Sequence, residues 1–148
     1  MEKVTKEVMG AVFFEQGRIL VMRRAPFMSC PGSWEFPGGK LEAGETHEAC
    51  LARELREELH IEARIGAFLA DNRHEYEFGT VHLCVYRVLS WKGDIALTVH
   101  DDMRWELTSG RHRIRVAEHV DRDPVFTDLF RRLRRNAELC GGRHVQNF

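Results

Sequence analysis

Three glutamates, Glu54, Glu57 and Glu58, are spaced so that they could hold a divalent cation. Residues three and four positions apart share one face of a helix, so on a helix these carboxylates would converge. An all-oxygen ligand set suits Mg²⁺, with Mn²⁺ as a substitute, and Mg²⁺ is usually held by a few carboxylates and the phosphates of a substrate. The stripe therefore predicts chemistry on a phosphate compound. The alternative is a solvated face on which Arg53 and Arg56 pair with the acids.

A helix over residues 46–60 is predicted to carry these carboxylates. Thr46 is a residue type that caps helix N-termini. A Pro-Gly-Gly turn at 37–39 and a short loop precede it. A neighbouring face of the helix can be buried, because leucines recur on it at helical spacing, namely Leu51, Leu55 and Leu59. The sequence therefore places a glycine turn shortly before a half-buried acidic helix.

The stretch 39–61 resembles the signature motif of the Nudix family. In that motif a glycine, a glutamate and the run Arg-Glu-aliphatic-any-Glu-Glu-any-Gly-aliphatic stand at fixed spacing. The matching residues are Gly39, Glu45, Arg53, Glu54, Leu55, Glu57, Glu58 and Ile61. His60 departs from the motif, since the family has a glycine there that ends the helix in a left-handed conformation. The resemblance implies a hydrolase of nucleoside diphosphate derivatives.

The acidic residues are assigned to two roles. Glu57 and Glu58 are predicted metal ligands, and Glu54 is either a third ligand or the base that orients the attacking water. The resemblance favours the role of general base for Glu54, and it adds the main-chain carbonyl of Gly38 as a metal ligand. The family takes a further ligand from a late loop, and that residue is absent here. Asp102, or the aspartate before it, is the nearest substitute.

The other motif residues are given structural roles. Glu45 and Arg53 are expected to pair and to fix the loop on the helix, and Gly39 belongs to the turn. Nearby cations could reach a phosphate or could be ordinary surface charges, and these are Arg23, Arg24 and Lys40.

Outside the motif, residues 34–40 (WEFPGGK) and several later positions resemble the MutT branch of the family, and this resemblance covers most of residues 8–135. The branch converts nucleoside triphosphates to monophosphate and pyrophosphate, which implies attack of water at the β-phosphorus. Phe36 would lie near the base of the nucleotide, unless it packs in the core. His82 matches a branch residue, although a histidine inside a strand is more often a satisfied core residue.

These motifs do not decide which nucleobase the substrate carries. Branch members that hydrolyse 8-oxo-dGTP have a base-reading asparagine where Arg122 stands, and arginine can only donate hydrogen bonds. A carboxylate at Asp121 or Asp123 could instead accept from a cytosine amino group. ADP-ribose, a nucleotide sugar or a dinucleoside polyphosphate are alternative substrates, and a catalytically idle nucleotide-binding module is an alternative function.

Composition favours one soluble domain. The chain has 148 residues, 43% of them hydrophobic, and a formal charge of −1 that gives no case for nucleic acid or an acidic membrane. No apolar stretch is long enough to span a bilayer. The four cysteines form no CxxC pair, so we expect reduced thiols in a cytoplasmic protein and no zinc site. A monomer or homodimer is expected.

The remaining pattern predicts an α+β fold. Strands are expected at 8–14, 18–24, 34–36 and 81–91, and 95–99 is expected to pair back on the last of these. A second helix should follow Asp123 and Pro124 on an apolar stripe. The Nudix resemblance implies an α/β/α sandwich with a mixed sheet. We expect a single domain over 1–140 and a flexible tail over 141–148.

Overall fold

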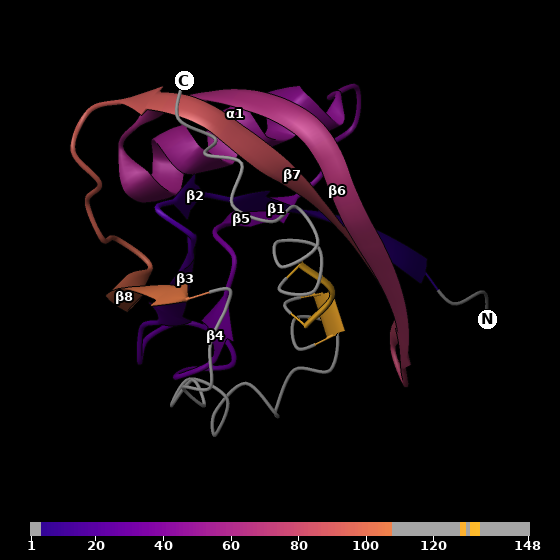
Figure 1. Cartoon of the computed structure of the whole chain (residues 1–148). Coiled ribbons are helices and arrows are strands. Elements are labelled where there is room, and N and C mark those ends of the chain that lie inside the picture. The colour runs from indigo at the N-terminus through magenta and orange to yellow at the C-terminus, as the bar shows by residue number, and fades with distance from the viewer. Residues whose placement is uncertain (1–3, 108–127, 130, 134–148) are drawn as a thin grey trace.

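The computed structural model describes residues 4–107, 128–129 and 131–133 (Figure 1). The strands are β1 (Val4–Val12), β2 (Phe14–Glu15), β3 (Arg18–Arg24), β4 (Trp34–Glu35), β5 (Gly38–Lys40), β6 (Glu62–Tyr76), β7 (Gly79–Lys92) and β8 (His100–Leu107), and helix α1 is His47–Leu59. Residues 128–129 and 131–133 are helical, in line with the predicted second helix. The expected start of that helix, and the tail at 141–148, lie outside the described residues.

Among the described residues, four strands form a mixed sheet in the order β5-β1-β7-β6. β1 is parallel to β7, while the β1–β5 and β6–β7 pairs are antiparallel. β3 pairs with β2, β4 and β8 in a second, antiparallel sheet. Helix α1 covers one face of the mixed sheet, and the described part of the C-terminal helix lies on the other (Figure 1). The predicted α/β/α sandwich with a mixed sheet is thereby confirmed.

Alternation of side chains along β7 divides the core into two layers. Val85 faces the layer that holds Leu129 and Leu133, whereas Cys84 and Tyr86 face α1. The predicted leucine stripe of α1 is fully buried in the second layer and consists of Leu51, Leu55 and Leu59. Burial of each leucine contributes about 2 kcal/mol, so the helix is anchored with its acidic stripe turned away from this layer.

Both ends of α1 show why the helix begins and ends where it does. The hydroxyl of Thr46 accepts a hydrogen bond of 3.1 Å from the amide of Ala49, as expected for an N-cap. His60 takes the left-handed conformation, with φ of 57°, and its amide donates to the carbonyl of Arg56. A histidine in this conformation costs about 1–2 kcal/mol relative to glycine. The departure from the family motif therefore leaves the helix end in place.

The prediction that 95–99 pairs back on the preceding strand is wrong. This segment, which lies within the described part of the chain, forms no strand and instead caps the C-terminal end of α1. The amide of Ala96 donates to the carbonyl of Leu59, and the hydroxyl of Thr98 donates to the carbonyl of Glu58. These bonds satisfy carbonyls that the helix leaves without partners. β8 then begins at His100 and pairs with β3.

Candidate active site

The glycine turn and the acidic face of α1 meet at β5. The amide of Gly38 lies 3.4 Å from the Oε2 atom of Glu58. A Cβ atom on Gly39 would lie 2.6 Å from Oε2 of Glu54 and closer still to the rest of that carboxylate, which is nearer than real Cβ atoms come. At Gly38, φ is +153° and a Cβ would strike the backbone of Met9. Gly39 is therefore needed for β5 to pass so close to Glu54, and Gly38 for β5 to lie so close to β1.

Negative charge accumulates where α1 faces this turn. Burial, together with the carboxylates of Glu54 and Glu35, raises the pKa of Glu58 to about 8. Burial also raises the pKa of Glu54, although the guanidinium of Arg53 opposes that shift. Glu57 is more exposed, with 59% of its side chain accessible, and accepts a hydrogen bond from Arg53. The donor set consists of oxygen atoms carrying more negative charge than Arg53 offsets, which suits a divalent cation of the Mg²⁺ or Mn²⁺ type.

The predicted pairing of Glu45 with Arg53 is confirmed. Nε and Nη2 of Arg53 donate to the two oxygens of Glu45 over 2.7 and 2.9 Å, a bidentate arrangement. This bonding, with help from the amide of Glu42, lowers the pKa of Glu45 to about 2. Arg53 also donates to the carbonyl of Lys40 and to Glu54. One guanidinium thus joins the loop, β5 and the acidic face of the helix.

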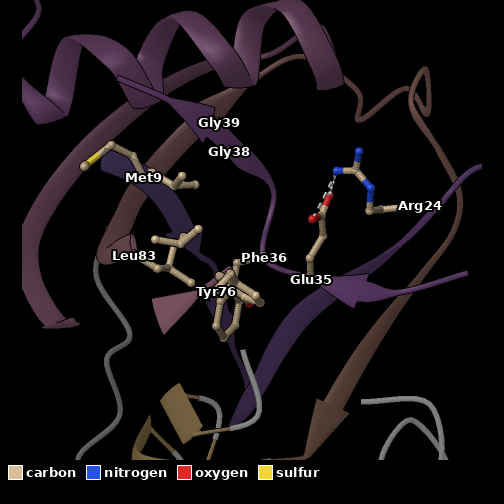
Figure 2. A pocket seen from close by; sticks show the side chains of 10 residues that line it. Met9, Arg24, Glu35, Phe36, Gly38, Gly39, Tyr76 and Leu83 are labelled. Carbon is tan, nitrogen blue, oxygen red and sulfur yellow. Dashed lines mark hydrogen bonds and ion pairs between the residues drawn. The ribbon is translucent and has the colours of Figure 1, made fainter. Parts of the chain in front are cut away.

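A pocket opens beside the turn (Figure 2). Its polar side holds the ion pair between Arg24 and Glu35, and its other side is aromatic and aliphatic (Figure 2). The lining residues are Val8, Met9, Arg24, Glu35, Phe36, Gly38, Gly39, Tyr76, Val81 and Leu83. Apolar walls with a few fixed polar groups are typical of small-molecule sites, and a flat ring could lie between them.

Glu35 is a site residue that sequence reasoning missed. Its carboxylate is bonded to Nη1 of Arg24 over 3.1 Å and to Nε2 of His100 over 2.9 Å. The His100 side chain is completely buried, and Arg24 is itself held by Ser29. Glu35 stands between two buried aromatic residues, and a carboxylate in such surroundings needs partners. The position of Glu35 between two apolar residues was the signal in the sequence. Its partner His100 could not be predicted, because it reaches Glu35 only when β8 pairs with β3.

Several predicted site residues lie in the pocket or beside the glycine turn. Phe36 and Arg24 line the pocket. Lys40 is exposed on β5 beside the turn. Arg23, next to Arg24 on β3, is directed instead to Asp101, 2.7 Å away, and its guanidinium lies over the ring of Trp34. Alternation along the strand separates the two arginines, since neighbouring side chains of a strand point to opposite faces.

Two other predictions are not supported by position. His82 lies on the face of β7 opposite the pocket, because Val81 and Leu83 on either side of it line the pocket. His82 therefore does not line this pocket, and its contact with a substrate stays a prediction. The carboxylate of Asp102 accepts from the amide of Met103 and from Arg104, both on β8, and its role as a metal ligand stays a prediction. Asp121 and Arg122 lie outside the described residues.

Comparison with known proteins agrees with this geometry. The NUDIX domain model matches residues 4–130, so the chain belongs to the Nudix family. Within that family it is a MutT-like hydrolase of phosphoanhydrides. It is 36% identical over 99 residues to the CTP pyrophosphohydrolase of Escherichia coli K12, an alignment that covers 67% of this chain and 73% of that protein. It is 33% identical to the 8-oxo-dGTP diphosphatase of Proteus vulgaris over 58% of this chain and 77% of that protein.

Solved structures give the same fold. The solution structure of the E. coli ORF135 protein superposes with a TM-score of 0.71 at 29% identity, covering 97% of this chain and 96% of that chain. The crystal structure of a MutT protein from Methanosarcina mazei Go1 gives a TM-score of 0.72 at 22% identity and covers 97% and 99% of the two chains. No helix in the described part of the chain is both long and apolar enough to cross a membrane.

Proposed function

We propose that this hydrolase uses Mg²⁺ to convert a nucleoside triphosphate to the monophosphate and pyrophosphate. The preferred substrate has a nucleobase with an amino group, and CTP or dCTP is the first candidate. The observation that carries the base preference is the fixed carboxylate of Glu35 at the rim of an apolar pocket. An ionised carboxylate only accepts hydrogen bonds, and the cytosine N4 amino group donates them. Similarity to the E. coli CTP pyrophosphohydrolase supports the same substrate.

The metal assignment follows the donor set. We assign Glu57, Glu58 and the carbonyl of Gly38 as the ligands, because the first two offer carboxylates and the third belongs to the turn that contacts Glu58. When bound, Mg²⁺ would neutralise phosphate charge and make water more acidic. The pocket lies beside the same turn, so a base within it directs its phosphates toward α1.

The chain's own residues supply the general base of the reaction and fix its orientation. Glu54 accepts the proton of the attacking water, and a raised pKa brings it closer to the pH at which a general base works best. Arg53 donates to Oε1 of Glu54 over 3.0 Å and so fixes the direction of that carboxylate. The water oxygen attacks the β-phosphorus, the bond to the oxygen shared with the α-phosphorus breaks, and the monophosphate leaves. Lys40, exposed on β5 beside the turn, is the proposed phosphate contact.

Product analysis with Mg²⁺ across a substrate panel tests the reaction. The panel holds the common ribo- and deoxyribonucleoside triphosphates, 8-oxo-dGTP, ADP-ribose and a dinucleoside polyphosphate. We expect monophosphate and pyrophosphate from CTP or dCTP. The relatives named 8-oxo-dGTP diphosphatase make that nucleotide the second candidate. Cleavage of the ADP-linked compounds alone would overturn the triphosphate assignment.

Glu35→Gln tests how the base is read. A glutamine amide can also donate, so the variant should donate a hydrogen bond to the O4 carbonyl of uracil, which the carboxylate repels. We expect the ratio of kcat/KM for CTP to that for UTP to fall about 10- to 100-fold, since one good base contact is worth about 1–3 kcal/mol. Glu48→Gln, which changes an exposed carboxylate on α1 outside the pocket lining, is the control. An unchanged ratio would place base recognition elsewhere.

A further inference from the structure

Three adjacent strands bring metal-ligating side chains together on the face of the mixed sheet opposite the pocket. Glu7 of β1 stands directly across from His82 of β7, and Asp71 of β6 stands across from Cys84 of β7. His82 and Cys84 are two residues apart on one strand, so their side chains share a face. Neither the hydrolase site nor the proposed function uses this cluster.

The polar atoms of the cluster are close together. Nδ1 of His82 lies 2.6 Å from Oε2 of Glu7, and its Nε2 lies 2.7 Å from Oδ2 of Asp71. The sulfur of Cys84 lies 3.9 Å from Nδ1 and 3.5 Å from Nε2. One ligand atom each from Glu7, His82 and Cys84 falls within 4.8 Å of the others. That spacing leaves the three groups within reach of a single ion after small side-chain rotations.

We propose that Glu7, His82 and Cys84 form a binding site for Zn²⁺ or a similar thiophilic divalent cation, with Asp71 orienting the histidine. A thiolate, an imidazole and a carboxylate are the donors that Zn²⁺ takes, whereas Mg²⁺ prefers oxygen alone. A metal-bound histidine normally donates its second N–H to a carboxylate, and Asp71 stands where it would accept that bond. Three protein ligands leave a fourth tetrahedral position for water.

The surroundings of the cluster allow an ion to enter and to be retained. The side chain of Glu7 is 36% exposed, so the site opens to solvent on that side. His82 is only 12% exposed and Cys84 is buried, so the nitrogen and sulfur donors are held by the sheet. The thiol proton of Cys84 goes to solvent as its sulfur binds the ion, and Nδ1 of His82 binds the ion while Nε2 carries the proton that faces Asp71.

The ion would join strands that carry the nucleotide pocket. Val8 follows Glu7 on β1, and Val81 and Leu83 flank His82 on β7, and all three line the pocket on the other face. A bond across β1 and β7 would therefore hold the apolar wall of the pocket from behind. The site is structural in this proposal, and it takes no part in the hydrolysis.

Titration of the purified full chain with Co²⁺, followed by absorption, tests the proposal. Excess Mg²⁺ is present throughout to occupy the oxygen-ligated site on α1. A tetrahedral site with a thiolate gives strong visible bands and a sulfur-to-cobalt charge-transfer band, while oxygen ligands alone give weak absorption. We expect both strong features to saturate at one equivalent of Co²⁺ and to disappear when Zn²⁺ is added.

Variants assign the bands to the cluster. Cys84→Ser should abolish the charge-transfer band, and Cys30→Ser, which removes an exposed thiol, should leave it unchanged. Asp71→Asn should keep the band and weaken Co²⁺ affinity about 10- to 100-fold, as loss of an orienting carboxylate does. Circular dichroism checks that each variant is folded. Absence of the charge-transfer band from the parent, or its persistence in folded Cys84→Ser, would overturn the site.

Discussion

Gly39→Ala is the substitution that most directly tests the geometry of Glu54, the proposed general base. The new Cβ would lie 2.6 Å from Oε2 of Glu54 and closer to its other carboxylate atoms, whereas ordinary contact begins at 3.4 Å. The carboxylate must therefore retreat by about 1 Å. A displacement of this size in a reacting group costs about 10²-fold in rate, or about 2.7 kcal/mol of transition-state stabilisation.

The same substitution should leave the fold nearly unchanged. Gly39 has no positive φ, so alanine adopts its backbone conformation without strain. The group that must move is the end of a flexible side chain and not the backbone. We therefore expect kcat for the best panel substrate to fall about 100-fold while the melting temperature shifts little.

Gly44→Ala is the control, in the loop that follows β5. Its φ is +82° and a Cβ there would meet nothing within 4 Å. Alanine should cost about 1–2 kcal/mol of stability through the left-handed conformation and leave kcat unchanged. The two variants thus separate a catalytic effect from a stability effect.

Repeating Gly39→Ala in a Glu54→Gln background shows whether the loss acts through Glu54. Most of the rate has then already been removed, so the second change should cost little more, because residues that act as one unit are not additive. Parental kcat in Gly39→Ala, or a second full loss in the Glu54→Gln background, would refute the role given to this carboxylate.

Two further predictions concern the metal ligands and the loop. Glu57→Gln should lower kcat by orders of magnitude without unfolding the protein, because a charged ligand is lost from an exposed position. Glu45→Gln should lower the melting temperature at neutral pH, because Arg53 holds the pKa of Glu45 at about 2, below its ordinary value. A lowered pKa stabilises the fold above the pKa of the unfolded chain and loses this effect as pH falls, so the difference from the parent should shrink below about pH 4.5.

Both predictions have direct controls. Steady-state kinetics and thermal melting are measured on Glu57→Gln beside Glu48→Gln, which should keep the parental rate. Parental turnover in Glu57→Gln would show that the metal ligands are misassigned. For the loop, melting curves of the parent and Glu45→Gln are compared from neutral pH down to about pH 3. A difference that stays constant over this range would mean that the Glu45–Arg53 pair does not account for the stability.

The local parts of this protein could be predicted from its sequence. Thr46 caps α1, its leucines are buried, and Glu45 pairs with Arg53, all as the spacing and the motif indicated. Even the departure at His60 was placed correctly at the helix exit. Helical hydrogen bonds join residues four apart, so spacing along the chain decides which side chains share a face.

Contacts between strands were decided only by the tertiary structure. The 95–99 segment reads as a strand, but the end of α1 offered carbonyls that its amide and hydroxyl groups could satisfy. Glu35 acquires His100 as a partner 65 positions away, because β4 and β8 both pair with β3. Sequence alternation separates the two faces of a strand, but it does not say which face meets the pocket.

The cluster around His82 shows the same limit. The sequence offers four separate cysteines and predicts no zinc site, since none has a partner nearby in the chain. Glu7 meets His82 across 75 positions because β1 docks parallel to β7 in one particular register. Helix contacts are set by the local path of the backbone, whereas sheet contacts depend on which strands pair and in what register. For that physical reason the sequence determined the acidic helix, and the packed sheet determined what surrounds it.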